Sequence, residues 1–220
     1  YNESYRLRKE AAERLHADRM AFIRSHRQSP LALYVANEMI SKSFSVPATD
    51  LEEILARNCR ISDTARAARF CRQAEQACYF CKDIHYPDVP LHTPTFDTTL
   101  LSAHIRPGHV TLIDCWASWC GPCRAAIPKV KALYDKYGRD RFDVISISLD
   151  SKKEDWQKAL EEEKMPWPQF IAGNRGYKQL TSRYNISSIP NLILIDGKGQ
   201  VVCNTFSPEE IRIELEQILR

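Results

Sequence analysis

The chain has 220 residues, of which 44% are hydrophobic and 27% are charged, a balance typical of a folded globular protein. The formal net charge is +3, and basic and acidic residues are balanced in both halves, so nothing predicts nucleic-acid binding. No apolar run approaches the roughly 20 residues that a membrane-spanning helix needs, so we expect no stable membrane insertion. Because the chain begins with Tyr1 and not with Met, we expect that a leader or anchor has been removed.

The first part of the chain has a helical pattern from residue 5 to residue 82. Apolar side chains recur at spacings of four and seven on one face of a first helix: Leu7, Ala11, Leu15 and Phe22. Ser29-Pro30 and the Thr49–Glu52 capping box each predict the start of a further helix, and a fourth is expected over 63–80. We therefore expect an all-α helical domain over 1–82, followed by a proline-rich linker over 83–96.

After the linker the pattern changes to strands that alternate with helices. The expected elements, in chain order, are a strand at 110–115, a helix at 121–137, a strand at 142–150, a helix at 152–163, a strand near 170, a helix at 177–184, strands at 191–195 and 200–205, and a last helix that Ser207 and Glu210 cap. Gly197-Lys198-Gly199 between the last two strands predicts that they form a hairpin. Within 142–150, isoleucines alternate with Ser146 and Ser148, the pattern of a half-buried strand. The alternation predicts an α/β fold over 97–220, with a mixed sheet flanked by helices.

One segment carries the chemistry, Asp114-Cys115-Trp116-Ala117-Ser118-Trp119-Cys120-Gly121-Pro122-Cys123, at the end of a strand and the start of a helix. The unpaired N–H groups and the dipole of a helix start stabilise a thiolate, which lowers the pKa of Cys120 from about 8.5 towards about 7. The i, i+3 spacing brings Cys123 close enough to Cys120 for a disulfide. We expect Cys120 to be the accessible nucleophile and Cys123 to resolve the mixed disulfide. Since the dithiol itself holds the electrons, neither an organic cofactor nor a metal is implied.

The chain from about residue 90 resembles the thioredoxin fold, and in particular the TlpA/ResA-like branch of extracytoplasmic thiol–disulfide oxidoreductases. The resemblance rests on Trp116 to Cys123, on Ile189-Pro190 before the strand at 191, and on the segment Ser151–Ile171, which is similar to the insertion of this branch. The amino-terminal helices, including Phe22-Ile23 and Leu31-Ala32-Leu33-Tyr34, resemble the helical region that precedes many such domains in Bacteroidetes-type bacteria.

The resemblance implies roles for further residues. Ile189-Pro190 matches the cis-proline loop, which faces the cysteine pair and offers its backbone to an extended substrate. Asp114 matches a buried acid that passes a proton to or from the second cysteine, and burial would raise its pKa toward the operating pH. The expected catalytic residues are thus Cys120, Cys123, Asp114 and Pro190, and the expected substrate-binding residues are Trp119, Gly121, Pro122 and Ile189. Trp116 either flanks the site or belongs to the core.

The same resemblance implies a reductase of protein disulfides in the bacterial periplasm or cell envelope, recharged by a membrane electron-transfer protein. Its partners would be disulfide-containing client proteins. Many relatives carry a glutamate three residues after the second cysteine, where this chain has Ala126. The resemblance therefore does not imply a particular reduction potential or partner specificity. Two alternatives are a net oxidant of client thiols and a partner-binding module, in which the helical domain captures a client and redox activity is secondary.

The other cysteines allow several interpretations. Cys71, Cys78, Cys81 and His85 have a spacing that suits four zinc ligands, although three ligands on one helix make a tetrahedron hard to build. A disulfide among Cys59, Cys71, Cys78 and Cys81 and free thiols are the alternatives. We expect Cys78 and Cys81 to be structural, because the end of a helix disfavours a thiolate.

Two other thiol chemistries fit less well. A peroxidase of the peroxiredoxin type needs Thr or Ser three residues before its cysteine and Pro seven before, where this chain has Ala117 and Ile113. A Cys–His hydrolase does not account for the Cys-x-x-Cys pair. Cys115 is expected to be a small core residue, and Cys203 carries no signal.

Overall fold

The computed structural model describes residues 2–26, 29–40, 46–58, 70, 72, 74, 83–138 and 141–219. The chain divides into two compact units, residues 1–84 and 85–220. Cys59, Cys71, Cys78 and Cys81 lie outside the described residues, and so does most of the fourth helix expected over 63–80. None of the described helices combines the length and the apolar character that crossing a membrane requires.

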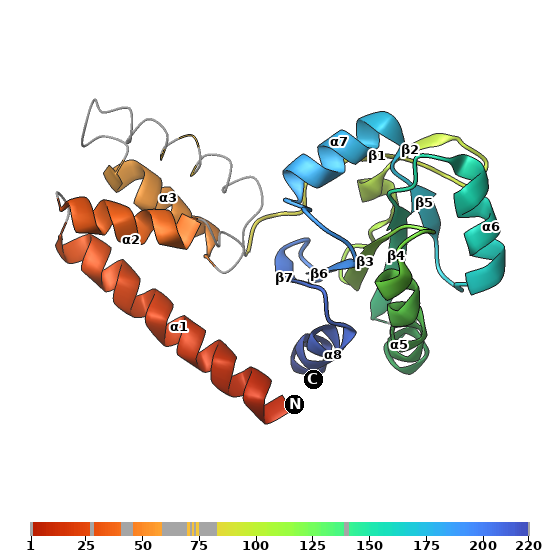
Figure 1. Ribbon diagram of the computed structural model, residues 1–220. Coiled ribbons are helices and arrows are strands. Elements are labelled where there is room, and N and C mark those ends of the chain that lie inside the picture. Colours follow the sequence, from red (N-terminus) through yellow and green to blue (C-terminus); the bar gives the residue numbers. More distant parts are fainter. Residues whose placement is uncertain are drawn as a thin grey trace. The chain divides into compact units, whose positions relative to one another are not determined.

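Three described helices make up most of the first unit: α1 (Asn2–Ser25), α2 (Pro30–Ile40) and α3 (Ala48–Asn58) (Figure 1). The predicted start of α2 is confirmed: Pro30 is its first residue, and the Ser29 hydroxyl accepts a hydrogen bond from the Leu31 N–H at 3.2 Å. The predicted cap at Thr49 is wrong by two residues, since α3 begins at Ala48 and the first backbone hydrogen bonds of the helix are accepted by the carbonyl of Pro47.

The core of the first unit uses only the second half of α1. Met20 and Ile23 are 1% exposed and pack with buried side chains of α2 and α3, among them Ala36, Met39, Leu51 and Ile54. The apolar face predicted from Leu7 and Leu15 is not buried, since these side chains are about half exposed. Leu31 and Tyr34 of α2 are exposed as well. The alternative in which the helical region captures a partner rests on these four side chains.

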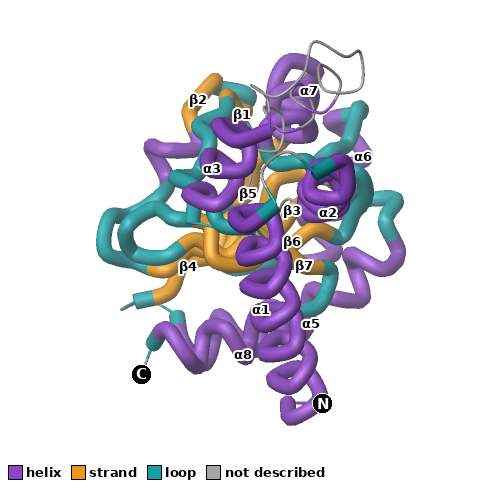
Figure 2. The backbone as a smooth tube through the Cα atoms, turned by 90° about the vertical axis from the view of Figure 1, so that its left-hand side faces the viewer, coloured by secondary structure: helices purple, strands orange, loops and turns teal. Residues whose placement is uncertain are grey.

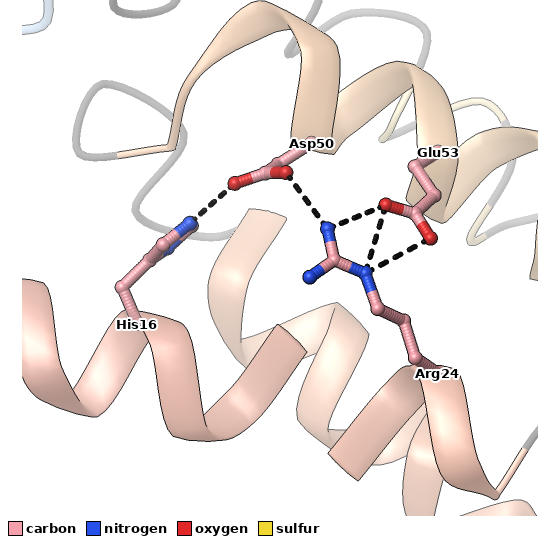
Figure 3. Close-up of polar contacts among 4 residues, drawn as sticks. All are labelled: His16, Arg24, Asp50 and Glu53. Carbon is pink, nitrogen blue, oxygen red and sulfur yellow. Dashed lines mark hydrogen bonds and ion pairs between the residues drawn. The ribbon is translucent and has the colours of Figure 1, made fainter. Parts of the chain in front are cut away.

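Polar contacts join α1 to α3 beside that core (Figure 3). Nε2 of His16 lies 2.6 Å from Oδ2 of Asp50. Arg24 donates to both carboxylate oxygens of Glu53, with a shortest contact of 2.7 Å, and also reaches Oδ1 of Asp50 at 3.4 Å. Because these groups are partly exposed, their contribution to the free energy of unfolding is small, and they chiefly fix the register of the two helices.

The second unit is built on one mixed sheet of seven strands in the order β2-β1-β5-β4-β3-β6-β7. The strands are β1 (Pro90–His92), β2 (Thr98–Leu100), β3 (Val110–Trp116), β4 (Phe142–Ser148), β5 (Gln169–Ile171), β6 (Asn191–Ile195) and β7 (Val201–Thr205). Figure 2 shows the central strands side by side in orange. β3, β4 and β5 run parallel, whereas β6 is antiparallel to β3 and forms the predicted hairpin with β7.

Helices cover both faces of this sheet. The four longer ones are α5 (Gly121–Tyr137), α6 (Lys153–Glu163), α7 (Gly173–Arg183) and α8 (Pro208–Ile218), and a short 3-10 turn follows β2. In Figure 1, α5 and α8 lie on one side of the sheet and α7 on the other. Val130 and Leu133 of α5 pack with Ile211 and Leu215 of α8 against the sheet, in a core that also contains Leu112. The predicted strand–helix order is confirmed.

Three local expectations differ from the structure. The range 83–96, expected to be a linker, contains β1, which pairs with both β2 and β5. β4 is buried on both faces, so Ser146 and Ser148 do not meet solvent as a half-buried strand would require. The capping box at α8 is wrong, because Glu210 accepts a hydrogen bond from the Thr205 hydroxyl and the Ser207 side chain does not cap the helix.

Candidate active site

The cysteine pair lies where β3 has ended and α5 begins. Cys120 is the residue that caps α5, and its Sγ accepts a hydrogen bond from the backbone N–H of Cys123 at 3.2 Å. Pro122 occupies the first turn, where its missing N–H leaves no helical hydrogen bond unmade. A disulfide joins Cys120 to Cys123 across a Cα–Cα distance of 5.3 Å. The sulfur of Cys120 thus sits at the positive end of the helix dipole, within reach of an unpaired donor.

Apolar side chains enclose both sulfurs. Cys120 is 4% exposed and Cys123 2%, so the expectation that only Cys120 is accessible is wrong for the oxidised pair. The cluster around them contains Trp116, Ala117, Ile127, Trp156, Ala159 and Ile171, with Phe96 and Ile189 packed at its edge. Trp116 therefore belongs to the core and also borders the site. The two cysteines hardly differ in exposure, but only Cys120 is the residue that caps α5.

The start of β6 lies beside this pair. Cys115 pairs with Asn191 and Asp114 with Leu192. Pro190, directly before β6, therefore lies near the end of β3, where the active-site loop begins. The predicted cis peptide bond between Ile189 and Pro190 is confirmed, and Ile189 packs against the cluster that holds both sulfurs.

The other residues expected to bind substrate lie at the surface around the disulfide. Trp119 is 71% exposed directly before Cys120, and Gly121 and Pro122 are also exposed. A large aromatic side chain that remains in water next to a buried disulfide is available to a partner protein.

Asp114 is buried in the sheet below the active-site loop, as expected. It is 5% exposed, and its Oδ2 accepts a hydrogen bond from the Ser146 hydroxyl at 2.8 Å on the neighbouring strand β4. Burial raises the pKa of Asp114 from 3.8 to about 6, although the hydrogen bond from Ser146 favours the charged form and lowers it. A carboxyl with this pKa exchanges its proton near neutral pH.

Comparisons with known proteins agree with this geometry. Residues 108–201 match the family described as Thioredoxin-like. A structure described as the thiol:disulfide interchange protein DsbE from Chlorobium tepidum is 32% identical, with a TM-score of 0.52, and the match covers 64% of this chain and 96% of that one. The chain belongs to the thioredoxin-like thiol–disulfide oxidoreductases.

Two further similarities concern the family and the fold. The thiol-disulfide oxidoreductase ResA of Geobacillus kaustophilus is 26% identical over 133 residues, which span 57% of this chain and 75% of that protein. The thioredoxin domain of a thiol-disulfide oxidoreductase from Bacteroides vulgatus, 24% identical with a TM-score of 0.58, shares the fold over 63% of this chain and 98% of its own. The predicted thioredoxin-like fold and family are thus confirmed.

In this oxidoreductase a second buried carboxylate holds the loop that leads to Cys120. Asp150, 6% exposed just after β4, accepts hydrogen bonds from the Ser118 N–H at 2.8 Å, from the Ser118 hydroxyl at 2.7 Å and from the Ser148 hydroxyl at 2.7 Å. The backbone adds a further connection, from the N–H of Leu149 to the carbonyl of Trp116. The end of β4 therefore anchors the active-site loop through charge-assisted hydrogen bonds.

We expect Asp150→Ala to lower the free energy of unfolding of this unit by about 3 kcal/mol, because three buried or half-buried donors lose one acceptor. Ser118→Ala should cost about 1 kcal/mol, since the backbone donor remains. Urea unfolding followed by tryptophan fluorescence measures both, because all four tryptophans lie between residues 116 and 167. Asp135→Ala, at an exposed position of α5, is the control and should stay within about 0.5 kcal/mol of wild type. An equally small effect of Asp150→Ala would contradict the anchoring role.

Sequence reasoning missed Phe96, Ser146 and Asp150. Phe96 was hidden in the expected linker, yet it packs against the active-site cluster and carries the Lys153 ammonium 3.4 Å above its ring. Ser146 and Asp150 belong to a visible signal, polar residues at 146, 148 and 150 with a spacing of two. The strand pairing places Ser146 and Ser148 on the face of the sheet that carries Asp114, and Asp150 follows two residues after the last of them.

Two cysteines besides the disulfide pair lie within the described residues. Cys115 is a buried free thiol, as expected, and burial raises its pKa well above the usual range, so it is not a nucleophile at neutral pH. Cys203 is buried on β7. Of the four residues considered as an alternative zinc site only His85 is described, and its ring stacks on Tyr86. Among the described residues no group of three or more His, Cys, Asp or Glu side chains is arranged to hold a metal ion.

Proposed function

We propose that this oxidoreductase reduces disulfide bonds of client proteins with the Cys120–Cys123 dithiol. The main support is the cap of α5, where the sulfur of Cys120 accepts a hydrogen bond from the N–H of Cys123 at the positive end of the helix. This arrangement stabilises negative charge on Cys120 in preference to Cys123, whose side chain lies one turn inside the helix.

The reaction then proceeds in two exchanges. The Cys120 thiolate attacks one sulfur of the client disulfide, a mixed disulfide forms, and the first client sulfur leaves as a thiolate. Cys123 gives its proton to the Asp114 carboxylate, its thiolate attacks Sγ of Cys120, and the second client sulfur leaves. Two electrons pass from the dithiol to the client, and the Cys120–Cys123 disulfide is the oxidised product.

Surface residues around the pair would hold the client. In this proposal the backbone at Ile189 and Pro190 aligns an extended client segment, and Trp119, Gly121 and Pro122 provide the exposed contact surface. Asp114 is the general acid–base, supported by its burial and by its pKa of about 6.

We further propose that the protein acts in the bacterial cell envelope. Support comes from its similarity to ResA and to the structure described as the interchange protein DsbE. A new cycle requires two electrons from outside the chain, and a dithiol-bearing membrane protein is the proposed donor. The helical region 1–82 is proposed as a separate domain.

The direction of electron flow is tested by the reduction potential of the pair. The full chain is equilibrated in dithiol–disulfide buffers of known potential, thiols are blocked by alkylation, and the reduced fraction is read by mass spectrometry. For a reductase we expect a value near or below that of thioredoxin, about −270 mV. A value near −120 mV would identify a net oxidant of client thiols and overturn the proposed direction.

A further inference from the structure

A chain of hydrogen bonds ends on Asp114. Nε1 of Trp167 donates to the Ser146 hydroxyl oxygen at 2.8 Å, and that hydroxyl donates to Oδ2 of Asp114 at 2.8 Å. The three residues come from separate places in the chain: Asp114 from β3, Ser146 from β4, and Trp167 from the segment between α6 and β5. All three side chains are buried, with exposures of 5%, 0% and 4%.

The two hydrogen bonds that lead to Asp114 can run in only one direction, from Trp167 through Ser146 to the carboxylate. An indole nitrogen is a donor only, so the Ser146 oxygen must act as acceptor toward Trp167. Ser146 therefore has a single proton left to donate. Its two possible acceptors are Oδ2 of Asp114 at 2.8 Å and the thioether sulfur of Met165 at 3.9 Å, and the sulfur is the weaker acceptor. The proton accordingly points to Asp114.

Neighbouring groups hold the two donors in place. The Trp167 ring packs edge-on against Tyr134, with 5.3 Å between ring centroids, inside the core between α5 and the sheet. The backbone N–H of Ser146 donates to the carbonyl of Pro168 at 3.1 Å, which ties the segment carrying Trp167 to β4. A rotation of either side chain away from Asp114 would leave a buried polar atom without its partner, at a cost in free energy.

We propose that Ser146 and Trp167 are positioning residues for Asp114, and that they determine the pH at which its carboxyl ionises by holding Oδ2 as a hydrogen-bond acceptor. This inference rests on the proposed function, because Asp114 is the acid–base group of that reaction. It follows that the exchangeable proton resides on Oδ1. A proton on Oδ2 would force Ser146 to turn its own hydrogen toward the thioether.

Other titratable groups lie on the elements that pack against this face of the sheet. The buried or half-buried groups of this kind are Cys123, Arg124, Lys131, Tyr134 and Tyr137 on α5, Lys153 and Glu163 on α6, Glu209, Glu210, Arg212, Glu214 and Glu216 on α8, Cys203 on β7, and Asp150 after β4. Cys123 does not titrate in the oxidised protein, Tyr137 donates to Glu216, and Asp150 is held by Ser118 and Ser148. Burial and the Ser146 hydrogen bond are thus the two influences on the pKa of Asp114.

The test is a direct titration of Asp114 in the oxidised full chain, labelled with carboxyl-¹³C aspartate and followed by NMR from pH 4 to pH 9. The Asp114 signal is identified by its loss in Asp114→Asn. In Ser146→Ala the midpoint should move upward by about one pH unit, because the carboxylate loses its hydrogen-bond donor. Ser146→Thr keeps a hydroxyl and should restore the wild-type midpoint. Ser148→Ala is the matched control: it removes a buried hydroxyl from the same strand, but that hydroxyl donates to Asp150, so the Asp114 midpoint should not move.

Trp167 is tested in the same titration. Trp167→Phe should raise the midpoint by less than Ser146→Ala, because the Ser146 hydroxyl remains but is no longer oriented by the indole. In the Ser146→Ala background, Trp167→Phe should have no further effect, since Trp167 acts only through Ser146. If Trp167→Phe does not fold, the wild-type indole N–H signal of Trp167 gives the answer: it should titrate with the Asp114 midpoint and lose that response in Ser146→Ala.

Two results would overturn the proposal: an unchanged Asp114 midpoint in Ser146→Ala, or an equal effect of Trp167→Phe with and without Ser146. The NMR midpoint does not depend on turnover. A failure of the proposed reductase function would therefore appear as missing disulfide reduction with these shifts intact, and a failure of the positioning role as missing shifts in an active reductase.

Discussion

Replacing Cys120 with serine should abolish the reduction of a protein disulfide. The hydroxyl that replaces the thiol has no comparable acidity and cannot form a mixed disulfide, so the first exchange does not start. Insulin reduction with dithiothreitol as electron donor measures this loss. Cys115→Ala is the matched control and should retain turnover, because it removes a buried free thiol of β3 and leaves the Cys120–Cys123 disulfide intact.

Cys123→Ser should behave differently, although it also stops the cycle. The Cys120 thiolate still attacks, and no resolving thiol releases the client, so covalent complexes accumulate and are visible on non-reducing gels. Since both sulfurs are almost equally buried, only the helix cap predicts which one is attacked from outside. Trapping by Cys120→Ser in place of Cys123→Ser would show that these roles are reversed.

Patterns local in sequence predicted most of the second unit. The helix expected over 121–137 and the hairpin of β6 and β7 agree with the structure, because each depends on periodicity and turn residues within a short window. The cis bond before Pro190 and the burial of Asp114 followed from the resemblance and are also confirmed.

Features that depend on distant partners did not follow from local patterns. β1 and β2 are three residues each. They take their stability from pairing with each other and from the pairing of β1 with β5, and no short window of the sequence contains all three strands. Ser146 looks like a solvent-facing position because it alternates with isoleucines. It is instead buried, since α5 covers that face and Trp167 and Asp114 satisfy its hydroxyl.

In the first helix, a local pattern predicted more burial than the structure has. Leu7 and Leu15 have the correct spacing for a buried face, but no described element of the first unit covers them. Burial begins only at Met20, where α2 and α3 pack against α1. Periodicity reports which side chains share a face, and the contacts of the folded chain decide which part of that face is covered.

Asp114→Asn should lower reductase turnover by roughly 10²-fold, because it keeps the shape of the side chain and removes its ability to take up a proton. In wild type, turnover should change with pH around the Asp114 pKa of about 6, and this dependence should be absent from the variant. The assay is insulin reduction from pH 5 to pH 8. An unchanged pH profile in a folded variant would show that Asp114 does not transfer the proton.

The same substitution should change how stability depends on pH. The pKa of Asp114 is raised from 3.8 to about 6 by folding, so between these values the native state retains a proton that the unfolded chain has lost. Stability therefore falls as the pH rises from about 4 to about 6, and above that it is lower by about 3 kcal/mol, an upper value for a buried carboxyl. Asp114→Asn has no such proton, so its stability should lack this decrease and exceed that of wild type at pH 8.

Urea unfolding at pH 4, 6 and 8, followed by tryptophan fluorescence, measures the effect in the unit that contains Asp114. The control is Asp135→Asn, which makes the same chemical change at an exposed position of α5 and should keep the pH dependence of wild type. Parallel stability curves for wild type and Asp114→Asn would mean that the buried carboxyl does not hold its proton. A variant that loses turnover but gains stability at pH 8 would instead show that the carboxyl is retained for the reaction at the expense of the fold.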